Sequence, residues 1–396
     1  MRLNQLALIT SLSFLPLISN AQTSINPKGE IKGEEVSYKV GERFIIKSTI
    51  LNEERQLLIH LPDDYNKSDK SYPVIFVLDG NSHFRHATVA ANILEQQNRM
   101  PQSIIVAIPN NQGTRGRDLG DQKDTFLNFI SNEVIPYTNK NYRISNHKTI
   151  FGHSMAGAFV IKALASKPDL FENYIAASPY MFPDDKALFT AFDKLFKNNQ
   201  SLNKSLYFTM TDVAAEGVEV TQALDKFVAL MKKQAPRSLN WHYEFIPEQV
   251  HMTTPYLTLY QGASYVFSDF HAPSYTQYSE FNKNGGIKGL QKVYEKRSAK
   301  YQVSPQIPER TIRRLGYNFM EANPKEAVEI FLQNSKSNPE SPGAKLALAR
   351  GYENLGSKKK ALLSFKQAVQ IAQKTSPQNV PFLQNQVERY QKLITE

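Results

Sequence analysis

The segment KTIFGHSMAG, residues 148–157, decides the fold, because it places a serine between an apolar run and the start of a helical pattern. Such a sharp turn from strand to helix exposes the serine side chain at the carboxyl edge of a sheet. The residues two positions before and after Ser154 must be small, and here they are Gly152 and Ala156. The segment therefore predicts a nucleophile elbow, although a serine at a helix start can also serve only as a cap.

Apolar runs alternate with helical patterns on both sides of this segment. The run YPVIFVL at residues 72–78 is apolar throughout, as expected of a parallel strand that is buried on both faces. The alternation predicts an α/β fold with a mostly parallel central sheet and helices on both faces. The other expected strands are 44–51 and 55–61, which form a hairpin, then 103–109, 148–152, 174–179, 205–211 and 241–246, and the expected helices include 87–96, 124–139 and 156–167.

A serine nucleophile needs a base, and the expected chain order in this kind of fold is serine, acid and then histidine. His251 follows the predicted strand 241–246 in a loop that can reach over the serine, so we expect it to be the base. His242 lies inside that strand and His271 lies in a polar segment, which favours structural or surface roles for both. His153 adjoins the serine but points off the turn, and we interpret it as a packing residue.

The acid that orients the histidine is expected just beyond the predicted strand 205–211. Asp212 stands at the end of that strand, and Glu216 and Glu219 follow closely. We prefer Asp212 by its position, with Glu216 a nearly equal second candidate, while Glu219 is expected in the next helix. A serine–histidine dyad without an acid also remains open.

An oxyanion hole requires two backbone N–H donors. One should be the amide of Met155, directly after the nucleophile. The other should come from the loop after the strand 72–78, where Asp79-Gly80 indicates a sharp turn, and we expect it to be the amide of Asn81.

These residues resemble the esterase family of α/β hydrolases that includes esterase D and the enterochelin-type siderophore esterases. The resemblance implies an α/β-hydrolase fold, with Ser154 as the nucleophile and His251 as the histidine. It also places Asn81 and Met155 at the positions whose amides form the oxyanion hole in related mycolyltransferases. The likeness extends roughly over residues 40–265 and rests on YPVIFVLDG (72–80), FLNFI (126–130), IPY (135–137), NYR (141–143), GHS (152–154), PDLF (168–171) and SP (178–179).

Three departures from the family pattern limit what the resemblance implies. Thr211 replaces the usual glycine before the acid. The segment RGRDL at 115–119 is followed by Gly120-Asp121 where Thr-Pro is usual, and the sequence after Ser178-Pro179 is Tyr180–Phe182 where a tryptophan-bearing segment is usual. The segments after residue 115 and after Ser178 are both expected to line the substrate site. The substrate could therefore differ from that of better-known members.

Beyond about residue 300 the strand-like runs cease and a helical repeat begins. Small and large residues fall at tetratricopeptide spacing in two registers, and a final helix at 381–393 could cap the array. An ordinary helical hairpin packed on the main domain is the alternative. The stronger register consists of Leu348, Tyr352, Gly356, Ala361, Phe365 and Ala368, and the weaker one of Leu315, Gly316, Phe319, Ala327, Phe331 and Pro339.

The N-terminus has the pattern of a secretory signal peptide. Arg2 precedes an apolar stretch, and small residues precede an expected cleavage after Ala21. We therefore expect a signal peptide at 1–21, an α/β-hydrolase domain at 22–290 and a small all-α region at 291–396. The protein is expected to be exported, to the periplasm or outside the cell, without stable membrane insertion; an N-terminal membrane anchor is the alternative.

The composition narrows the chemistry. The chain of 396 residues contains no cysteine, which excludes a disulfide framework, a cysteine nucleophile and thiolate metal ligands. The net charge of +10 is spread without a long basic run, so we expect no nucleic-acid partner. No histidine and carboxylate have convincing ligand spacing, so neither a metal nor a cofactor is expected.

The sequence favours an exported serine esterase that hydrolyses carboxylic esters through an acyl-enzyme. A siderophore or another acylated small molecule is an open choice of substrate. Acyl transfer on the same machinery is one alternative. A weakly active scaffold that binds a protein partner through the C-terminal repeats is the other.

Overall fold

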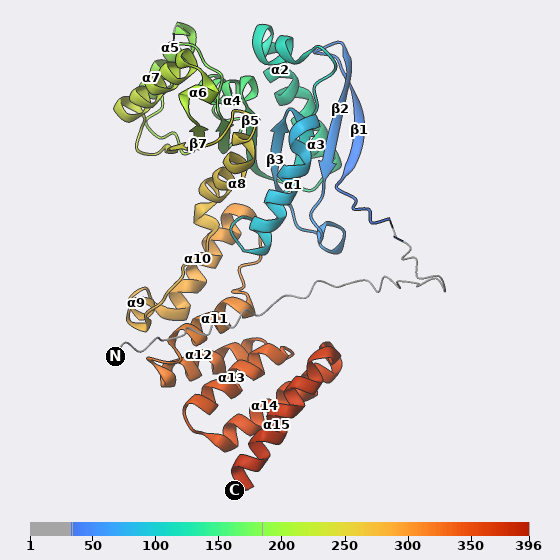
Figure 1. Ribbon diagram of the computed structural model, residues 1–396, viewed down its shortest axis with the longest axis vertical. Coiled ribbons are helices and arrows are strands. Elements are labelled where there is room, and N and C mark those ends of the chain that lie inside the picture. The colour runs from blue at the N-terminus through green and yellow to red at the C-terminus, as the bar shows by residue number, and fades with distance from the viewer. Residues whose placement is uncertain (1–32, 34, 184, 396) are drawn as a thin grey trace. The chain divides into compact units, whose positions relative to one another are not determined.

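The computed structural model describes residue 33, residues 35–183 and residues 185–395 (Figure 1). In this part of the chain, eight strands form one sheet in the order β1-β2-β4-β3-β5-β6-β7-β8. β1 and β2 pair antiparallel, as do β2 and β4, and all other neighbours pair parallel. The strands are β1 Glu42–Ser48, β2 Glu53–His60, β3 Tyr72–Leu78, β4 Ile104–Ile108, β5 Ile144–His153, β6 Asn173–Ala177, β7 Ser205–Met210 and β8 Asn240–Phe245.

The inner strands owe their position to continuous apolar sequence. Every side chain of β3 and of β4 is buried, as the apolar runs predict. The predicted α/β fold with a mostly parallel sheet and a helical C-terminal region is thus confirmed. β5 is longer than expected, because it begins at Ile144 rather than at Lys148.

Helices cover both faces of the sheet. α1 contacts β3 and β4, α8 contacts β6 and β7, and these two helices contact each other, whereas α4 contacts β5, β6 and α5. Right-handed crossovers that run outward in opposite directions from the centre of a sheet place their helices on opposite faces. These helices are α1 Gly80–Gln96, α2 Lys123–Phe129, α3 Ile135–Asn141, α4 Met155–Ser166, α5 Lys186–Asn198, α6 Val213–Glu216, α7 Val218–Gln234 and α8 Thr254–Val266.

The helix expected at 124–139 contains an irregular turn. α2 and α3 are joined by a wide π turn at Ile130–Val134. Glu133 lies in this turn, and its carboxylate accepts hydrogen bonds from the amides of Thr49 and Ile50 in the β1–β2 connection, at 2.8 and 3.1 Å. The wide turn thus fastens the edge hairpin to the helical layer, and π turns of this kind commonly occur where a helix has such a special task.

The C-terminal region is helical in the structure, with antiparallel neighbours that pack closely. A β-carbon on Gly316 would lie 2.3 Å from the ring of Phe331, and one on Gly351 would lie 2.8 Å from the same ring. The two glycines therefore allow Phe331 to fill the space between helices, although the likeness to tetratricopeptide repeats stays a prediction. The helices are α9 Tyr278–Lys283, α10 Gly286–Tyr301, α11 Glu309–Phe319, α12 Pro324–Ser337, α13 Pro342–Asn354, α14 Lys358–Thr375 and α15 Val380–Thr395.

Residues 41–396 form one compact unit. The predicted signal peptide at 1–21 lies outside the described residues. The predicted domain boundary at residue 290 falls inside α10, so the division between residues 22–290 and 291–396 stays a prediction. Within the described residues, no helix combines the length and the apolar character needed to cross a bilayer.

A buried ion-pair network fixes the segment after β4 against β2. The guanidinium of Arg55 is fully buried, and its Nη1 donates to Asp118 at 2.6 Å and to Glu53 at 2.9 Å. Arg117 binds both of the same carboxylates at 2.7 Å. The rings of Phe126 and Phe129 lie 5.4 and 5.6 Å from the Arg55 guanidinium, so the network also contacts the aromatic core.

We expect Arg55→Ala to lower the free energy of unfolding by about 3 kcal/mol, because the buried carboxylate of Asp118 would keep only one of its two cationic partners. Urea unfolding followed by fluorescence measures this change. Arg237→Ala, at an exposed arginine, is the control. Equal stability of the two variants would contradict the prediction.

Candidate active site

The turn after β5 has the strained geometry of a nucleophile elbow. Ser154 connects β5 to α4 with φ 59° and ψ −120°, a conformation that non-glycine residues rarely adopt. A β-carbon on Gly152 would lie 2.3 Å from the carbonyl oxygen of Ala156, so only glycine fits there. The small-residue pattern thus has its predicted cause, which is the close approach of the chain on the two sides of the serine.

The structure brings His251 to Ser154. Both residues line one cavity of about 400 Å³, together with Asn81 and Arg115. His251 lies in the loop between β8 and α8, as expected from the sequence. Its Nδ1 lies 2.6 Å from Oε2 of Glu216. The imidazole is about one-quarter exposed, so it is held on one side and open to the cavity on the other.

The carboxylate that contacts the histidine is that of Glu216, the second candidate, and not that of Asp212, the preferred one. Glu216 ends the short helix α6, and its side chain is only 1% exposed. Asp212 directly precedes that helix, and its Oδ2 accepts a hydrogen bond from the amide of Glu248 at 2.8 Å. One helical turn after β7 therefore carries Glu216 to the histidine, a displacement that the position of the strand end could not indicate.

Two hydroxyl groups complete the surroundings of Glu216. Ser178 follows β6 and donates to Oε1 of Glu216 at 2.6 Å, and its Oγ also lies 2.8 Å from Oγ1 of Thr254. Burial raises the pKa of Glu216, but the hydrogen bonds from His251 and Ser178 outweigh it and hold the pKa below its ordinary value. Because an ionised carboxylate only accepts hydrogen bonds, Nδ1 of His251 is the donor and Nε2 is left to accept a proton.

The two predicted oxyanion donors lie in first turns of neighbouring helices. Met155 begins α4 and Asn81 lies in the first turn of α1, after Asp79 in a left-handed conformation with φ 51°. The strands that precede them, β3 and β5, pair directly and in parallel, so both turns lie at the same edge of the sheet. Amides in the first turn of a helix have no partner within the helix, which suits them to bind an oxyanion.

His153 acts as a packing residue, as interpreted from the sequence. Its Nε2 lies 2.9 Å from the carbonyl oxygen of His251 and fastens the loop that carries the catalytic candidate. Burial lowers the pKa of His153 to about 4, so the ring is neutral near pH 7 and donates through Nε2. His242 lies within β8, where its ring stacks on Tyr207, and Glu219 lies in the first turn of α7. His271 is half-buried beside Arg99 rather than on the surface.

An ion pair that sequence reasoning missed lies in the cavity wall. Arg115 forms two parallel hydrogen bonds of 2.8 Å with the carboxylate of Asp79. The segment of Arg115 was expected near the substrate, but only the fold shows that it reaches the turn before Asn81. Ser178 was likewise known only as part of a motif, since its role depends on Glu216, which lies 38 residues away.

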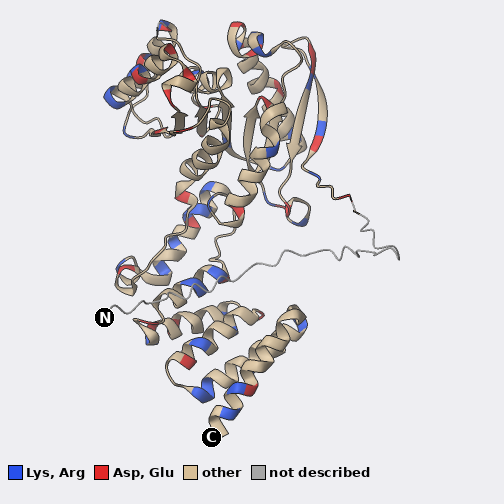
Figure 2. Ribbon diagram, in the orientation of Figure 1, with Lys and Arg blue, Asp and Glu red and all other residues tan. Residues whose placement is uncertain are grey.

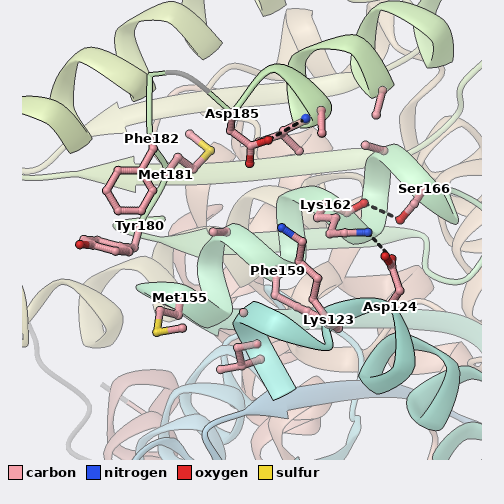
Figure 3. Close-up of a pocket in the computed structure, with 17 residues that line it drawn as sticks. Lys123, Asp124, Met155, Phe159, Lys162, Ser166, Tyr180, Met181, Phe182 and Asp185 are labelled. Carbon is pink, nitrogen blue, oxygen red and sulfur yellow. Dashed lines mark hydrogen bonds and ion pairs between the residues drawn. The ribbon is translucent and has the colours of Figure 1, made fainter. Parts of the chain in front are cut away.

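A second cavity, of about 370 Å³, lies beside Met155 (Figure 3). Its walls are mostly apolar and include Phe159 from α4 and the segment Tyr180–Phe182. Lys162 forms an ion pair with Asp124 at one side. The cavity therefore adjoins the candidate oxyanion donor, and both segments that depart from the family pattern contribute to its surroundings.

The fold and the turn at Ser154 define the protein as an α/β hydrolase. The chain belongs to the family described as "Putative esterase", which matches residues 48–254. The ferri-bacillibactin esterase BesA of Bacillus subtilis is 32% identical over 168 residues, which cover 33% of this chain and 57% of that protein. The chain thus spans little more than half the length of the curated relatives it matches.

Solved structures show the same fold. An IroE-like serine hydrolase from Shewanella oneidensis matches with a TM-score of 0.58 at 21% identity, covering 79% of this chain and 99% of that one. An uncharacterised protein from Capnocytophaga ochracea matches with a TM-score of 0.58 at 17% identity. The second match covers 89% of this chain and 99% of the other, so a similar fold extends beyond the family match.

We expect the stability difference between the wild type and Glu216→Gln to depend on pH. The folded-state pKa of Glu216 lies below its ordinary value of 4.5. Its carboxylate therefore stabilises the folded protein above that value, and this stabilisation is lost as the pH falls through the lowered pKa. Urea unfolding of both proteins between about pH 7 and pH 3 should show the difference shrinking toward acid. A difference that stays constant over this range would contradict the ion-pair assignment.

Proposed function

We propose that this protein is a carboxylic ester hydrolase in which Ser154 is the nucleophile, His251 the general base and Glu216 the acid that orients it. The observation that carries the proposal is the contact between His251 Nδ1 and the buried carboxylate of Glu216. His251 also lines the same cavity as Ser154. The chain order of serine, acid and histidine also agrees with this fold. Membership of the esterase family supports the same class of reaction.

The geometry supports a two-step reaction. Nε2 of His251 takes the proton of the Ser154 hydroxyl as Oγ attacks the ester carbonyl, and Glu216 stabilises the imidazolium that forms. The amides of Met155 and Asn81 stabilise the oxyanion of the tetrahedral intermediate. The intermediate collapses as the imidazolium returns the proton to the leaving alcohol. Water then attacks the acyl-enzyme by the same proton transfers and regenerates Ser154.

The lining of the cavity beside Met155 indicates that the substrate carries an apolar or aromatic group. Phe159, Tyr180 and Phe182 supply its aromatic walls, and a volume of about 370 Å³ suits a small organic group. A siderophore-type ester fits this requirement, and the relative BesA carries the name of a ferri-bacillibactin esterase. The expected signal peptide supports action in the periplasm or outside the cell.

We expect Ser154→Ala and Glu216→Gln to reduce ester hydrolysis far more than Asp212→Asn does. Loss of the nucleophile or of the orienting acid should lower kcat by about 10³-fold or more, because the first removes the attacking oxygen and the second removes the carboxylate that holds the histidine tautomer and stabilises the imidazolium. Asp212→Asn should change kcat by less than about threefold, since its contact lies at the loop backbone. The measurement is steady-state hydrolysis of short aryl esters, with circular dichroism to confirm folding.

Covalent labelling detects an activated serine without a known substrate. It therefore distinguishes an inactive scaffold from an active enzyme that was assayed with an unsuitable ester. A fluorophosphonate probe followed by peptide mapping should give one adduct on Ser154 in the wild type and none in Ser154→Ala. A folded wild-type protein without an adduct would refute the proposed nucleophile.

We expect Ala158→Phe to distinguish large from small substrates. Ala158 lies in α4 and lines the cavity beside Met155, so a phenyl ring there would occupy the proposed substrate space. The value of kcat/KM for aryl-acyl esters should fall about tenfold or more, while that for acetyl esters should change little. An equal change for both ester classes would contradict the assignment of this cavity.

A further inference from the structure

A cavity of about 320 Å³ lies at the opposite edge of the sheet from Ser154. Tyr72, at the start of β3, and Gln102, before β4, line it together with Tyr294 and Arg297 from α10. Ser154 follows the carboxyl end of β5, whereas these residues precede or begin strands parallel to it. The cavity is therefore separate from the candidate active site.

Arg297 is a buried cation in this cavity that forms no ion pair with the described residues. Its residue is only 5% exposed, and its guanidinium lies 3.8 Å from the ring centre of Phe270 and 4.4 Å from that of Tyr294. Its Nε and Nη1 are buried without hydrogen-bond partners among the described residues. An uncompensated buried cation is costly, and two aromatic faces do not replace an anion.

Asp269 acts electrostatically on Arg297 and Asp63 lines the cavity, but neither forms an ion pair with its guanidinium among the described residues. Asp269 is held by the ammonium of Lys300 at 2.6 Å and the hydroxyl of Tyr301 at 2.5 Å. Glu95 lines the cavity, but burial raises its pKa to about 8, so it is mostly protonated near pH 7. A protonated carboxyl can donate a hydrogen bond to an anion instead of repelling it.

A basic pocket of about 200 Å³ adjoins this cavity and shares Gln96, Asn98 and Pro308 with it. Arg99, Arg310 and Arg314 line the pocket, and its described lining contains no aspartate or glutamate. Figure 2 shows basic residues on α11, the helix that follows α10. We call the two adjoining cavities the junction cleft.

We propose that the junction cleft binds a small anion that carries carboxylate or phosphate groups. Arg297 provides the buried positive charge at one end, and Arg99 and Arg314 provide exposed charge at the other. Guanidinium groups suit both kinds of oxyanion, because their planar donors match the geometry of either. The bound ligand contacts α1 and the helices α10 and α11 together, so binding stabilises their association.

Isothermal titration calorimetry of the full-length protein tests this proposal with two probes, citrate and inorganic phosphate, each against sodium chloride at matched ionic strength. Saturable binding of either probe is expected, and the comparison shows whether carboxylate or phosphate is preferred. Arg297→Met, which retains an apolar contact with the aromatic rings, should weaken binding about tenfold or more. Arg237→Met, at an exposed arginine outside the cleft, is the matched control and should bind as the wild type does.

Arg314→Met provides a second variant that removes an exposed charge and does not disturb the core. It should weaken binding about threefold to tenfold, which keeps the test decisive if Arg297→Met fails to fold. The absence of saturable binding by both probes would overturn the proposal. Equal affinity of the wild type and the folded cleft variants would overturn it as well.

Discussion

The close approach of Gly152 to Ala156 is the constraint on which the candidate site depends. It allows the chain to pass from β5 into α4 within one residue, and Ser154 takes up the strain with a positive φ. A residue keeps a strained backbone conformation only where several surrounding interactions hold it in place. Here the amide of Ser154 donates to the carbonyl of Ala177 at 2.9 Å, and its carbonyl accepts from the amide of Tyr180 at 3.0 Å. Backbone hydrogen bonds to the end of β6 and to the segment after it thus stabilise the strained conformation of the serine.

Ion pairs with buried carboxylates place the remaining loops around this turn. Arg115 binds Asp79 with two hydrogen bonds and also approaches the carbonyl of His153 at 3.4 Å. It therefore links the loops after β3 and β5, which carry the two candidate oxyanion donors. Two residues further on, Arg117 joins the network of Arg55 and Asp118. One short segment thus connects β2 to the wall of the candidate active site.

Local sequence predicts the parts of this structure that depend on neighbours in the chain. The apolar run 72–78 and the small residues around Ser154 act within one element, and both predictions hold. The carboxylate that contacts His251 could not be predicted in this way, because Asp212 and Glu216 are separated by a single helical turn whose direction depends on the packing of α6. Similarly, the π turn at Ile130–Val134 depends on Glu133 reaching a hairpin that is distant in sequence. Such contacts between distant segments leave no periodic pattern to read.

The helical C-terminal region meets the α/β fold at the start of the strand that carries Ser154. Tyr301 ends α10 and is fully buried, with its ring 4.9 Å from that of His147 and 5.8 Å from that of Phe267. His147 lies near the beginning of β5, seven positions before Ser154 and so about 23 Å away along an extended strand. Burial lowers the pKa of His147 to about 3, so this contact is uncharged near pH 7 and depends on packing. β5 therefore has α10 of the helical region packed near one end and the strained serine directly after the other.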